Sequence, residues 1–466
     1  MPVRIQKKWA LVVVHYRYHQ ETGDIVKDSI ATPPSRLRWY QEINRSQWFT
    51  LIGAWLLWSL DAVDFLLITF VLIDISKTFD VSLHTASLLI LATFGVRWLG
   101  GMLFGNLSDR IGRKIPMLIA LIWFTTGAAL TGLAWNFAAV FAFRLLLGFG
   151  MAPILTLGST MIAEVWPEKH RAIGIGILVT GWGFGTVMAA TIYGLMYTHF
   201  GWRPMFFVGI VPGILVGLFV WHFVPESPVW KKSREQAVGV KQTSPALTLF
   251  RDHLGRVVIL SICQFMLQFG SWPFQGLLAT HLRELHMSPA AVSFVTSSGA
   301  IGQIFGFFCS GFIAERVGRR NAIAMMLALG CASVVGLMNL ASVSMQLAAA
   351  FAFLCGFFIV GASGIYPTVL AENIPSNVRA TGVGLMYNIG VIGGGIAPFV
   401  ILMALDRFRV GLPQGIMTAT ILADATGVLI IYLATRETRG ISIEDAGKSS
   451  AVESAVQDGG IRRDAW

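Results

Sequence analysis

The chain has 466 residues, of which 55% are hydrophobic and 13% charged, and its mean hydropathy is +0.66. Soluble proteins are about a quarter charged, so this composition excludes an ordinary soluble domain. The formal net charge of +10 is not gathered on a soluble module, which excludes a nucleic-acid-binding surface of the usual kind.

Apolar runs of about 20 residues, the length that crosses a bilayer of roughly 30 Å as a helix, follow one another along the chain. They are rich in Leu, Gly and Ala and lack the alternation of strands, so we expect an all-α integral membrane protein with twelve transmembrane helices. The first six expected spans are 50–73, 86–107, 116–134, 137–160, 172–196 and 204–224. The second six are 257–280, 291–314, 321–341, 346–370, 382–404 and 413–434.

Lys and Arg residues between the spans predict their orientation. If the N-terminus is inside, the expected inner loops carry fifteen basic residues and the outer loops carry five. Cytoplasmic loops are enriched in Lys and Arg, so both termini are expected to be cytoplasmic. The expected segments are a cytoplasmic N-terminal tail (1–48), a first six-helix half (49–224), a cytoplasmic central loop (225–256), a second six-helix half (257–434) and a cytoplasmic C-terminal tail (435–466).

The cysteines and histidines do not predict a metal site. All four cysteines fall inside expected spans without the spacing of metal ligands, so we expect them to be small packing residues. His15 and His19 are four residues apart, but no third ligand is near them. We therefore expect no metal, no cofactor and no catalytic residue.

An internal repeat is the most informative feature of the chain. "AEVWPEKHRAIGIG" (163–176) returns 208 residues later as "AENIPSNVRATGVG" (371–384). Two charged cassettes, "GNLSDRIGRK" (105–114) and "GFIAERVGRR" (311–320), stand 206 residues apart in register with that pair. The repeat predicts two halves in the same orientation, related by an axis along the membrane normal. Such an architecture places a substrate site near the midplane and lets one half rock against the other.

Each half should then carry a copy of one cytoplasmic device. We expect Arg113 to reach Glu164, and Arg319 to reach Glu372. These contacts would close the cytoplasmic side; the alternative is that the charges only set the topology. The residues assigned to this gate are Gly105, Asp109, Arg110, Gly112, Arg113, Glu164, Arg171, Glu315, Arg316, Gly318, Arg319, Glu372 and Arg379.

Two acidic residues of the cassettes are expected to reach across to other spans. Asp109 should lie near Thr381 and Gly382 at the N-terminal end of the eleventh span, where the helix dipole favours an anion. Glu315 should face the start of the fifth span. Both contacts would add to the closure of the cytoplasmic side.

The first cassette, with its Gly-x-Leu-Ser-Asp-Arg-x-Gly-Arg-Lys pattern, resembles the signature loop of the major facilitator superfamily. "PESPVW" (225–230) resembles a motif of its sugar and organic-acid porters, and "RLLLGFGMA" (144–152) resembles its Arg-Gly motif of the fourth span. Four further segments are informative: "LDAVDFLLI", "RWLGG", "SWPFQGLLATHL" and "YNIGVIGGGIAP". They resemble segments of the sialate:proton symporter family, to which carboxylate and aromatic-acid:proton symporters are related.

The resemblance covers about residues 39–435 and implies the major facilitator fold, with twelve helices in two pseudo-symmetric halves. It implies a monomeric transporter of the bacterial inner membrane that imports a small organic acid anion, such as sialate or another carboxylate, by proton symport and alternating access. The proton gradient is then the energy source. Pro153 and Ile154 stand where sialate transporters often carry an acidic residue, so the acid itself is left open.

Four charged residues lie inside expected spans 1, 2 and 4: Asp61, Asp64, Arg97 and Arg144. A charge at the bilayer centre costs about 2.5–3.5 kcal/mol, so each needs water, a partner or a function. One interpretation is a structural network that joins spans 1, 2 and 4. The other is that an Asp carries the coupling proton while an Arg attracts the substrate carboxylate. We expect Asp64 to be the carrier, because it is one turn nearer the outer face and closer in depth to Arg144.

The second half offers polar and aromatic candidates for a substrate cavity. Trp272 and Gln275 in span 7, and Tyr387 and Asn388 in span 11, could contact a substrate or simply pack between helices. Asp424 in span 12 is expected to make only a local hydrogen bond.

Two other functions are open to an integral membrane protein of this kind: export and catalysis. An exporter or proton antiporter of drugs or metabolites shares the fold, but span 5 lacks the Gly-Pro pattern of drug antiporters. An enzyme would need a cluster of His or carboxylates at one membrane face, and the sequence predicts none.

Overall fold

The computed structural model describes residues 39–167, 170–236, 245–374, 379–435 and 437. Residues 1–44 and 45–466 form two separate units. The described part of the first unit holds one short 3₁₀ helix, η1 (Trp39–Gln41). All that follows concerns the second unit.

All the regular secondary structure among the described residues of this unit is helical, which confirms the all-α expectation. The first half contains α1 (Arg45–Phe70), α2 (Leu72–Thr78), α3 (Leu83–Gly95), α4 (Arg97–Ile111), α5 (Lys114–Leu133), α6 (Phe137–Val165), α7 (Arg171–Phe200), η3 (Pro204–Phe207) and α8 (Ile210–Phe223). The connection contains α9 (Pro228–Gln236) and α10 (Pro245–Asp252). The second half contains α11 (Leu254–Glu284), α12 (Pro289–Val317), α13 (Arg319–Leu340), α14 (Met345–Cys355), η4 (Gly356–Val360), α15 (Tyr366–Glu372), α16 (Arg379–Phe408) and α17 (Leu412–Ala434).

Eleven helices of the described chain are long and apolar enough to cross a membrane, and Met345–Val360 is a shorter apolar helix. The expected tenth span, 346–370, is therefore broken. It runs as α14, one π-helical turn η4, a turn at 363–365 and α15. Pro367 follows this turn; proline lacks the N–H that an uninterrupted helix would need there. The broken span accounts for the twelfth expected crossing.

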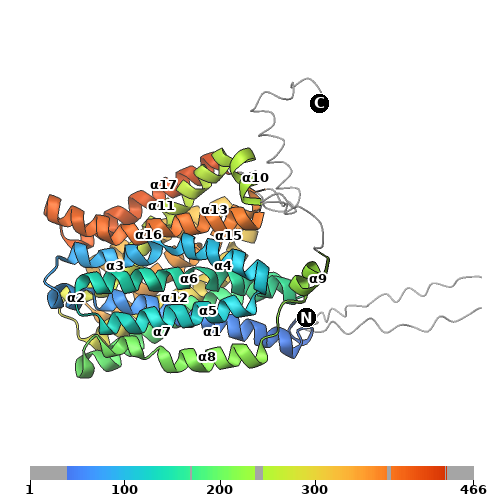
Figure 1. Ribbon diagram of the computed structural model, residues 1–466. Helices are drawn as coiled ribbons and strands as arrows, with labels where there is room; N and C mark the ends of the chain where they lie inside the picture. Colours follow the sequence, from blue (N-terminus) through green and yellow to red (C-terminus); the bar gives the residue numbers. More distant parts are fainter. Residues whose placement is uncertain (1–38, 168–169, 237–244, 375–378, 436, 438–466) are drawn as a thin grey trace, which may run out of the picture. The chain divides into compact units, whose positions relative to one another are not determined.

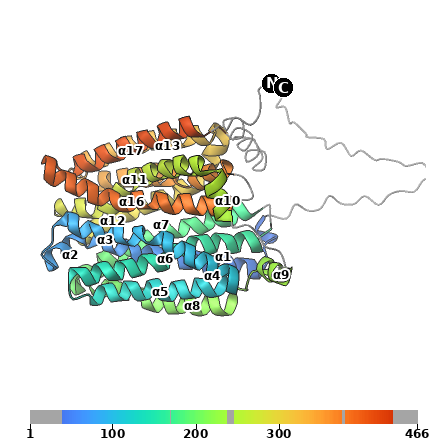
Figure 2. The same cartoon turned by 45° about the horizontal axis from the view of Figure 1, so that its top comes forward.

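Figure 1 and Figure 2 both place α2 at one end of the helix bundle and α9 and α10 at the other. We call the end with α9, α10 and the two charged cassettes the cassette end, and the end with α2 the opposite end. The two halves meet along the bundle, where α3 packs against α16 and α7 packs against α12.

Three spans begin at the opposite end with a side-chain cap. Ser82 accepts a hydrogen bond from the Thr85 N–H, and Asn136 accepts one from the Ala139 N–H. Ser288 caps α12 in the same way, with Pro289 in the first turn. These caps satisfy backbone donors that the first turn of a helix leaves free, so they fix where spans 2, 4 and 8 start.

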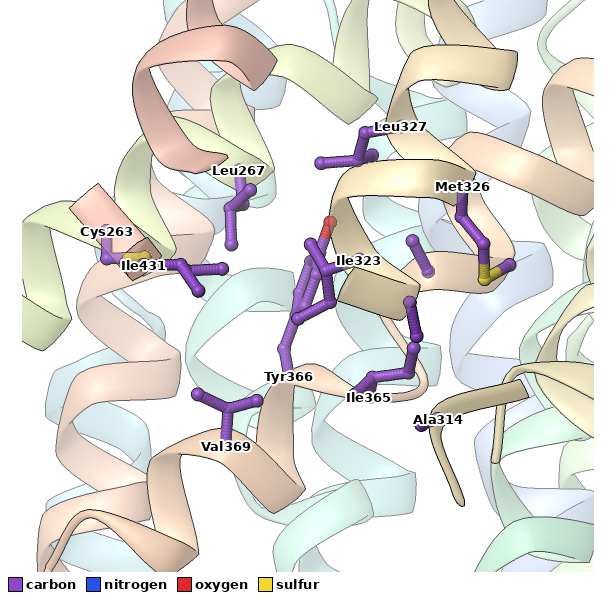
Figure 3. Close-up of a cluster of buried hydrophobic side chains, with 12 residues drawn as sticks. Cys263, Leu267, Ala314, Ile323, Met326, Leu327, Ile365, Tyr366, Val369 and Ile431 are labelled. Atoms are coloured by element: carbon purple, nitrogen blue, oxygen red, sulfur yellow. The ribbon is translucent and has the colours of Figure 1, made fainter. Parts of the chain in front are cut away.

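Figure 3 shows an apolar core of the second half, built mainly from α11, α13 and α15, with Ala314 from α12 and Ile431 from α17. Tyr366 stands at its centre, among Ile323, Leu327 and Leu267. Cys263 belongs to the same core, which agrees with the packing role expected of it. No described hydrogen-bond partner reaches the Tyr366 hydroxyl.

Candidate functional site

The structure brings the four intramembrane charges of the first half close together. Asp61 and Asp64 lie on α1, Arg97 begins α4 at the break in span 2, and Arg144 lies on α6. Their side chains are 0–3% exposed, so water reaches none of them in this conformation. Each must then be compensated by protein groups, by protonation or by a bound ion.

Arg144 is compensated mainly by backbone carbonyls. Its Nη1 and Nη2 donate to the carbonyls of Asp64 and Phe65, both at 3.2 Å, and its Nε donates to Thr93 Oγ1 at 3.1 Å. The guanidinium also lies 5.5 Å from the centre of the Phe65 ring. These bonds join α6 to α1 and α3, so the geometry supports the structural interpretation of this residue.

The two aspartates differ in what they face. Neither carboxylate has a hydrogen-bond partner among the described residues. Asp64 Oδ1 lies against Gly209 at the start of α8, on the side of the first half. Asp61 is within electrostatic range of Arg97, and both interact with Tyr387 of the second half. Of the two, Asp61 is therefore the carboxylate at the boundary between the halves.

Arg97 is less constrained than Arg144. Its Nε has no partner among the described residues, and its guanidinium lies 5.7 Å from the centre of the Phe94 ring. Moving Arg144 away from its partners would be costly, because a buried cation would lose its hydrogen bonds. Arg97, by contrast, still has an N–H group that can donate to an incoming acceptor. A carboxylate is the acceptor that best matches a guanidinium.

Five rings from α1, α3, α7 and α11 form an aromatic cluster beside these charges: Trp58, Phe65, Phe94, Trp182 and Trp272. Trp272 lies 4.7 Å from Phe94 and 5.5 Å from Phe65, measured between ring centres. Trp182 lies 5.0 Å from Trp58 and 6.2 Å from Trp272. The cluster joins both halves, and the Trp58 Nε1–H is buried without a described partner.

The four predicted cavity residues fall around this cluster. Trp272 is part of it, and Gln275 Oε1 accepts a hydrogen bond of 3.3 Å from Trp182 Nε1. Tyr387 interacts with Arg97 and Asp61, as described above. Asn388 donates to the Gly384 carbonyl at 2.9 Å within its own helix.

Sequence reasoning missed Trp58 and Trp182. The repeat held a signal for Trp182, because an offset of 208 residues maps it onto position 390, within one turn of Tyr387. Residues at equivalent depth in spans 5 and 11 should face the same midplane region.

Both predicted cassette ion pairs are present. Arg113 donates from Nε and Nη2 to the two carboxylate oxygens of Glu164, at 3.3 and 3.0 Å. Arg319 Nε lies 3.4 Å from Glu372 Oε1. Each pair lies within one half and links the start of one span to the end of the next, so it strengthens that half rather than joining the two.

Glu226 completes the first copy of this device, and the sequence did not predict its role. Its two carboxylate oxygens accept the backbone N–H groups of Arg113 and Lys114, at 2.8 and 3.2 Å. Gly112, just before them, has a φ of +98°, which a residue with a side chain rarely adopts. The "PESPVW" motif thus supplies a carboxylate to the start of α5.

Glu437 plays the same part in the second copy. It accepts the backbone N–H groups of Arg319 and Arg320, at 2.9 and 3.2 Å, and Gly318 has a φ of +95°. The two copies therefore share three parts: a glycine with positive φ, two backbone N–H donors, and an acidic residue that follows the last span of the half.

The remaining gate predictions are only partly covered by the described residues. The side chains of Asp109 and Arg379 lie outside them, so the predicted contact near Thr381 and Gly382 stays a prediction. Arg110, Glu315 and Arg316 are exposed. Glu315 was expected to face the start of the fifth span, where the side chain of Ala172 is not described, so this contact stays a prediction. Arg171 Nε donates to the Trp166 carbonyl at 3.3 Å.

A groove of about 590 Å³ lies elsewhere, between α11, α16 and α17 of the second half. Its lining is mostly apolar and includes the exposed side chains of Phe408 and Leu422. It contains none of the buried charges, so it is not the candidate substrate site.

The sequence pattern of the Major Facilitator Superfamily matches residues 49–398. The chain belongs to this superfamily. It is a multi-pass membrane transporter and not an enzyme, which confirms the resemblance drawn from the motifs.

Named relatives cover most of the chain. The sialic acid transporter NanX of Escherichia coli K12 is 29% identical over 381 residues, 82% of this chain and 93% of that protein. The cis,cis-muconate transport protein of Acinetobacter baylyi is 29% identical over 369 residues, 77% and 88% of the two chains. The niacin transporter NiaP of the same species is 27% identical over 422 residues, 84% and 94%.

The fold is also that of solved structures. A bacterial homologue of the human lysosomal transporter Spinster, in an inward-facing and unoccupied conformation, matches with a TM-score of 0.61 and 19% identity. The match covers 88% of this chain and 98% of that chain. The likeness confirms the major facilitator fold that the resemblance implied.

Proposed function

We propose that this transporter is a proton-coupled secondary active importer of a small organic acid anion, and that it works by alternating access. We assign the coupling proton to Asp61, in place of Asp64, which the sequence favoured. The observation that carries the proposal is the Asp61 carboxylate, which has no hydrogen-bond partner among the described residues and lies within electrostatic range of Arg97 and of Tyr387 of the other half. The relatives named above, which transport sialic acid, muconate and niacin, support an organic acid as the substrate.

Charge balance at Asp61 and Arg97 gives the coupling. In the empty transporter, the Asp61 carboxylate and the Arg97 guanidinium compensate each other. In the loaded transporter, the substrate carboxylate compensates Arg97, and Asp61 is neutral because it holds the proton. Substrate without proton leaves one uncompensated negative charge, and proton without substrate leaves one uncompensated positive charge. Both half-loaded states bury a net charge, so their passage through the closed conformation is disfavoured.

The aromatic cluster supplies the apolar part of the site. Its rings lie at the same depth as the charges and come from both halves, so a substrate placed there would contact both. Aromatic faces favour flat or ring-containing molecules, which pack against them in offset or edge-on geometry. We expect Trp272, Gln275, Tyr387 and Asn388 to provide the contacts of the second half.

The basic loops support a cytoplasmic cassette end. Both termini then lie in the cytoplasm, in keeping with the enrichment of Lys and Arg on that side of bacterial inner-membrane proteins. In this proposal the protein acts as a monomer, and the proton gradient is its only energy source.

Uptake of a labelled panel of organic acids into cells that express the protein tests the proposal. The panel should hold sialate, muconate, nicotinate and a benzoate, each measured with and without a protonophore. We expect one class of acid to accumulate and the protonophore to abolish the accumulation. Accumulation that rises with the protonophore would indicate an exporter or antiporter, and no uptake of any acid would contradict the proposed substrate class.

A further inference from the structure

A partly buried polar network joins the two halves at the opposite end of the bundle. Arg283, on α11 of the second half, pairs with the carboxylate of Asp74 on α2 of the first half. Arg283 Nη2 donates to Asp74 Oδ1 at 3.0 Å and to the Tyr197 hydroxyl at 2.8 Å. The Tyr197 hydroxyl in turn donates to Asp74 Oδ1 at 2.6 Å. The three side chains thus bond each other in a closed triangle.

The network also caps a helix. Arg283 Nη1 donates at 3.1 Å to the carbonyl of Phe70, the last residue of α1, where a cation is favoured by the helix dipole. The guanidinium lies 5.0 Å from the centre of the Tyr197 ring. One arginine of the second half therefore holds three elements of the first half: α1, α2 and α7.

Burial distinguishes this network from a second contact between the halves at the same end. The side chains of Arg283 and Asp74 are 14% and 15% exposed. The pair of His84 and Asp406, which joins α3 to α16 at 2.9 Å, is 33% and 69% exposed. Exposed pairs contribute little, whereas breaking a partly buried charge-assisted network removes a larger stabilisation.

Glycines at the two ends of the bundle differ in their surroundings. At the opposite end, Ser293 on α12 packs directly against Gly194 on α7, so the two halves are in contact there. At the cassette end, a methyl group added at Gly176 or Gly384 would meet no described atom within 4 Å. The network thus lies at an end where the halves touch.

We infer that Arg283, Asp74 and Tyr197 form a latch that holds the opposite end shut, and that the latch must break each time this end opens. Opening moves the two halves apart, and Arg283 then loses Asp74, Tyr197 and the α1 carbonyl together. Because the bonds exist only in this closed state, weakening them shifts the population towards the conformation that is open at this end. The inference rests on alternating access and not on any substrate or proton.

Alkylation of two introduced cysteines in the purified full-length protein tests the latch without a substrate. Ser293→Cys reports access at the opposite end, and Gly384→Cys reports access at the cassette end. Alkylation rates with a maleimide are read by peptide mass spectrometry, so the native cysteines can remain. Each reporter is combined with Asp74→Asn, Arg283→Gln or Tyr197→Phe, and with the matched exposed-pair variants His84→Gln and Asp406→Asn.

We expect Asp74→Asn and Arg283→Gln to raise the alkylation rate at position 293 about tenfold and to lower it at position 384. Tyr197→Phe should act in the same direction with a smaller effect, and the His84 and Asp406 variants should stay within about twofold. Unchanged rates, or rates that rise at both reporters, would overturn the latch. If the charge variants do not fold, Tyr197→Phe decides the question. The inference is contradicted if this variant does not raise the alkylation rate at position 293 and lower it at position 384.

Discussion

In the first half, Glu226 holds the backbone that follows Gly112 while Arg113 reaches Glu164. In the second half, Glu437 does the same after Gly318 while Arg319 reaches Glu372. The centres of the halves do not repeat in this way. At its centre the first half buries Asp61, Asp64, Arg97 and Arg144, whereas the second half buries amides and aromatic rings there, together with the carboxylate of Asp424.

The two halves are thus alike at their cassettes and unlike at their centres. The cassette device fixes how consecutive spans of one half are joined, and both halves need the same joint. Substrate and proton, by contrast, need only one set of charges, which one half can supply. We therefore place the transport chemistry in the first half, with the second half providing the facing wall.

The largest effect is expected from Asp61→Asn. Asparagine cannot take up or release the proton, so the empty transporter would bury Arg97 without its counter-charge. A charge at this depth costs about 2.5–3.5 kcal/mol, which corresponds to roughly a hundredfold in rate. Uphill uptake should fall by about that factor. Exchange of preloaded substrate should change by only a few-fold, because exchange never requires the empty transporter to return. Equal loss in both assays would contradict this role.

Arg144→Gln should destabilise the protein more than any other single change at the centre. Removal of the arginine leaves two carbonyls and the Thr93 hydroxyl without their donor, and a hydrogen bond that involves a charged group contributes about 1.5–3 kcal/mol. Thermal unfolding in detergent measures the loss.

Arg97→Gln is the matched variant. It should be more stable than Arg144→Gln but should bind substrate roughly tenfold more weakly, because it removes an anion partner. The reverse order of stability would contradict the assignment.

The two cassette copies should differ slightly. Arg113 makes two bonds to Glu164, whereas Arg319 makes one longer contact with Glu372. Arg113→Gln is therefore expected to lower stability by about 1–2 kcal/mol, and Arg319→Gln by less than about 1 kcal/mol. Parallel thermal unfolding of the two variants checks this order. Equal losses would mean that the second pair is as strong as the first.

Asp424→Asn should have the smallest effect on transport, which makes it the control for Asp61→Asn. Asp424 is as deeply buried as Asp61, but it lies within the second half, where the Cys331 thiol is 3.9 Å from its Oδ2. This thiol, on the neighbouring α13, makes a weak hydrogen bond, whereas Asp424 Oδ1 has no partner among the described residues. Uphill uptake should stay within about twofold of wild type. A loss as large as that of Asp61→Asn would place proton coupling in the second half as well.

The sequence predicted most of what depends on spacing along the chain. The repeat identified both arginine–glutamate pairs, because equivalent residues of the two halves stand about 206–208 positions apart. The apolar runs identified the spans within a few residues. The break in span 10 was missed because hydropathy does not distinguish α-helix from a π turn, although Pro367 marked the boundary.

Contacts between side chains and backbone were beyond prediction. The roles of Glu226 and Glu437 depend on N–H groups exposed by a glycine turn, and the partners of Arg144 are mostly carbonyls. The aromatic cluster depends on the packing of four helices, so its rings share no pattern of spacing. The different surroundings of Asp61 and Asp64 were likewise invisible, because both lie on the same helix only three residues apart.

The central claim is that the coupling proton resides on Asp61. The most direct measurement is alkalinisation of the medium when the transported acid is added to cells that express wild type, Asp61→Asn, Asp64→Asn or Asp424→Asn. The account predicts alkalinisation by wild type, Asp64→Asn and Asp424→Asn, and none by Asp61→Asn. Alkalinisation by Asp61→Asn at the wild-type rate would contradict it, and loss in Asp64→Asn alone would move the proton to that carboxylate.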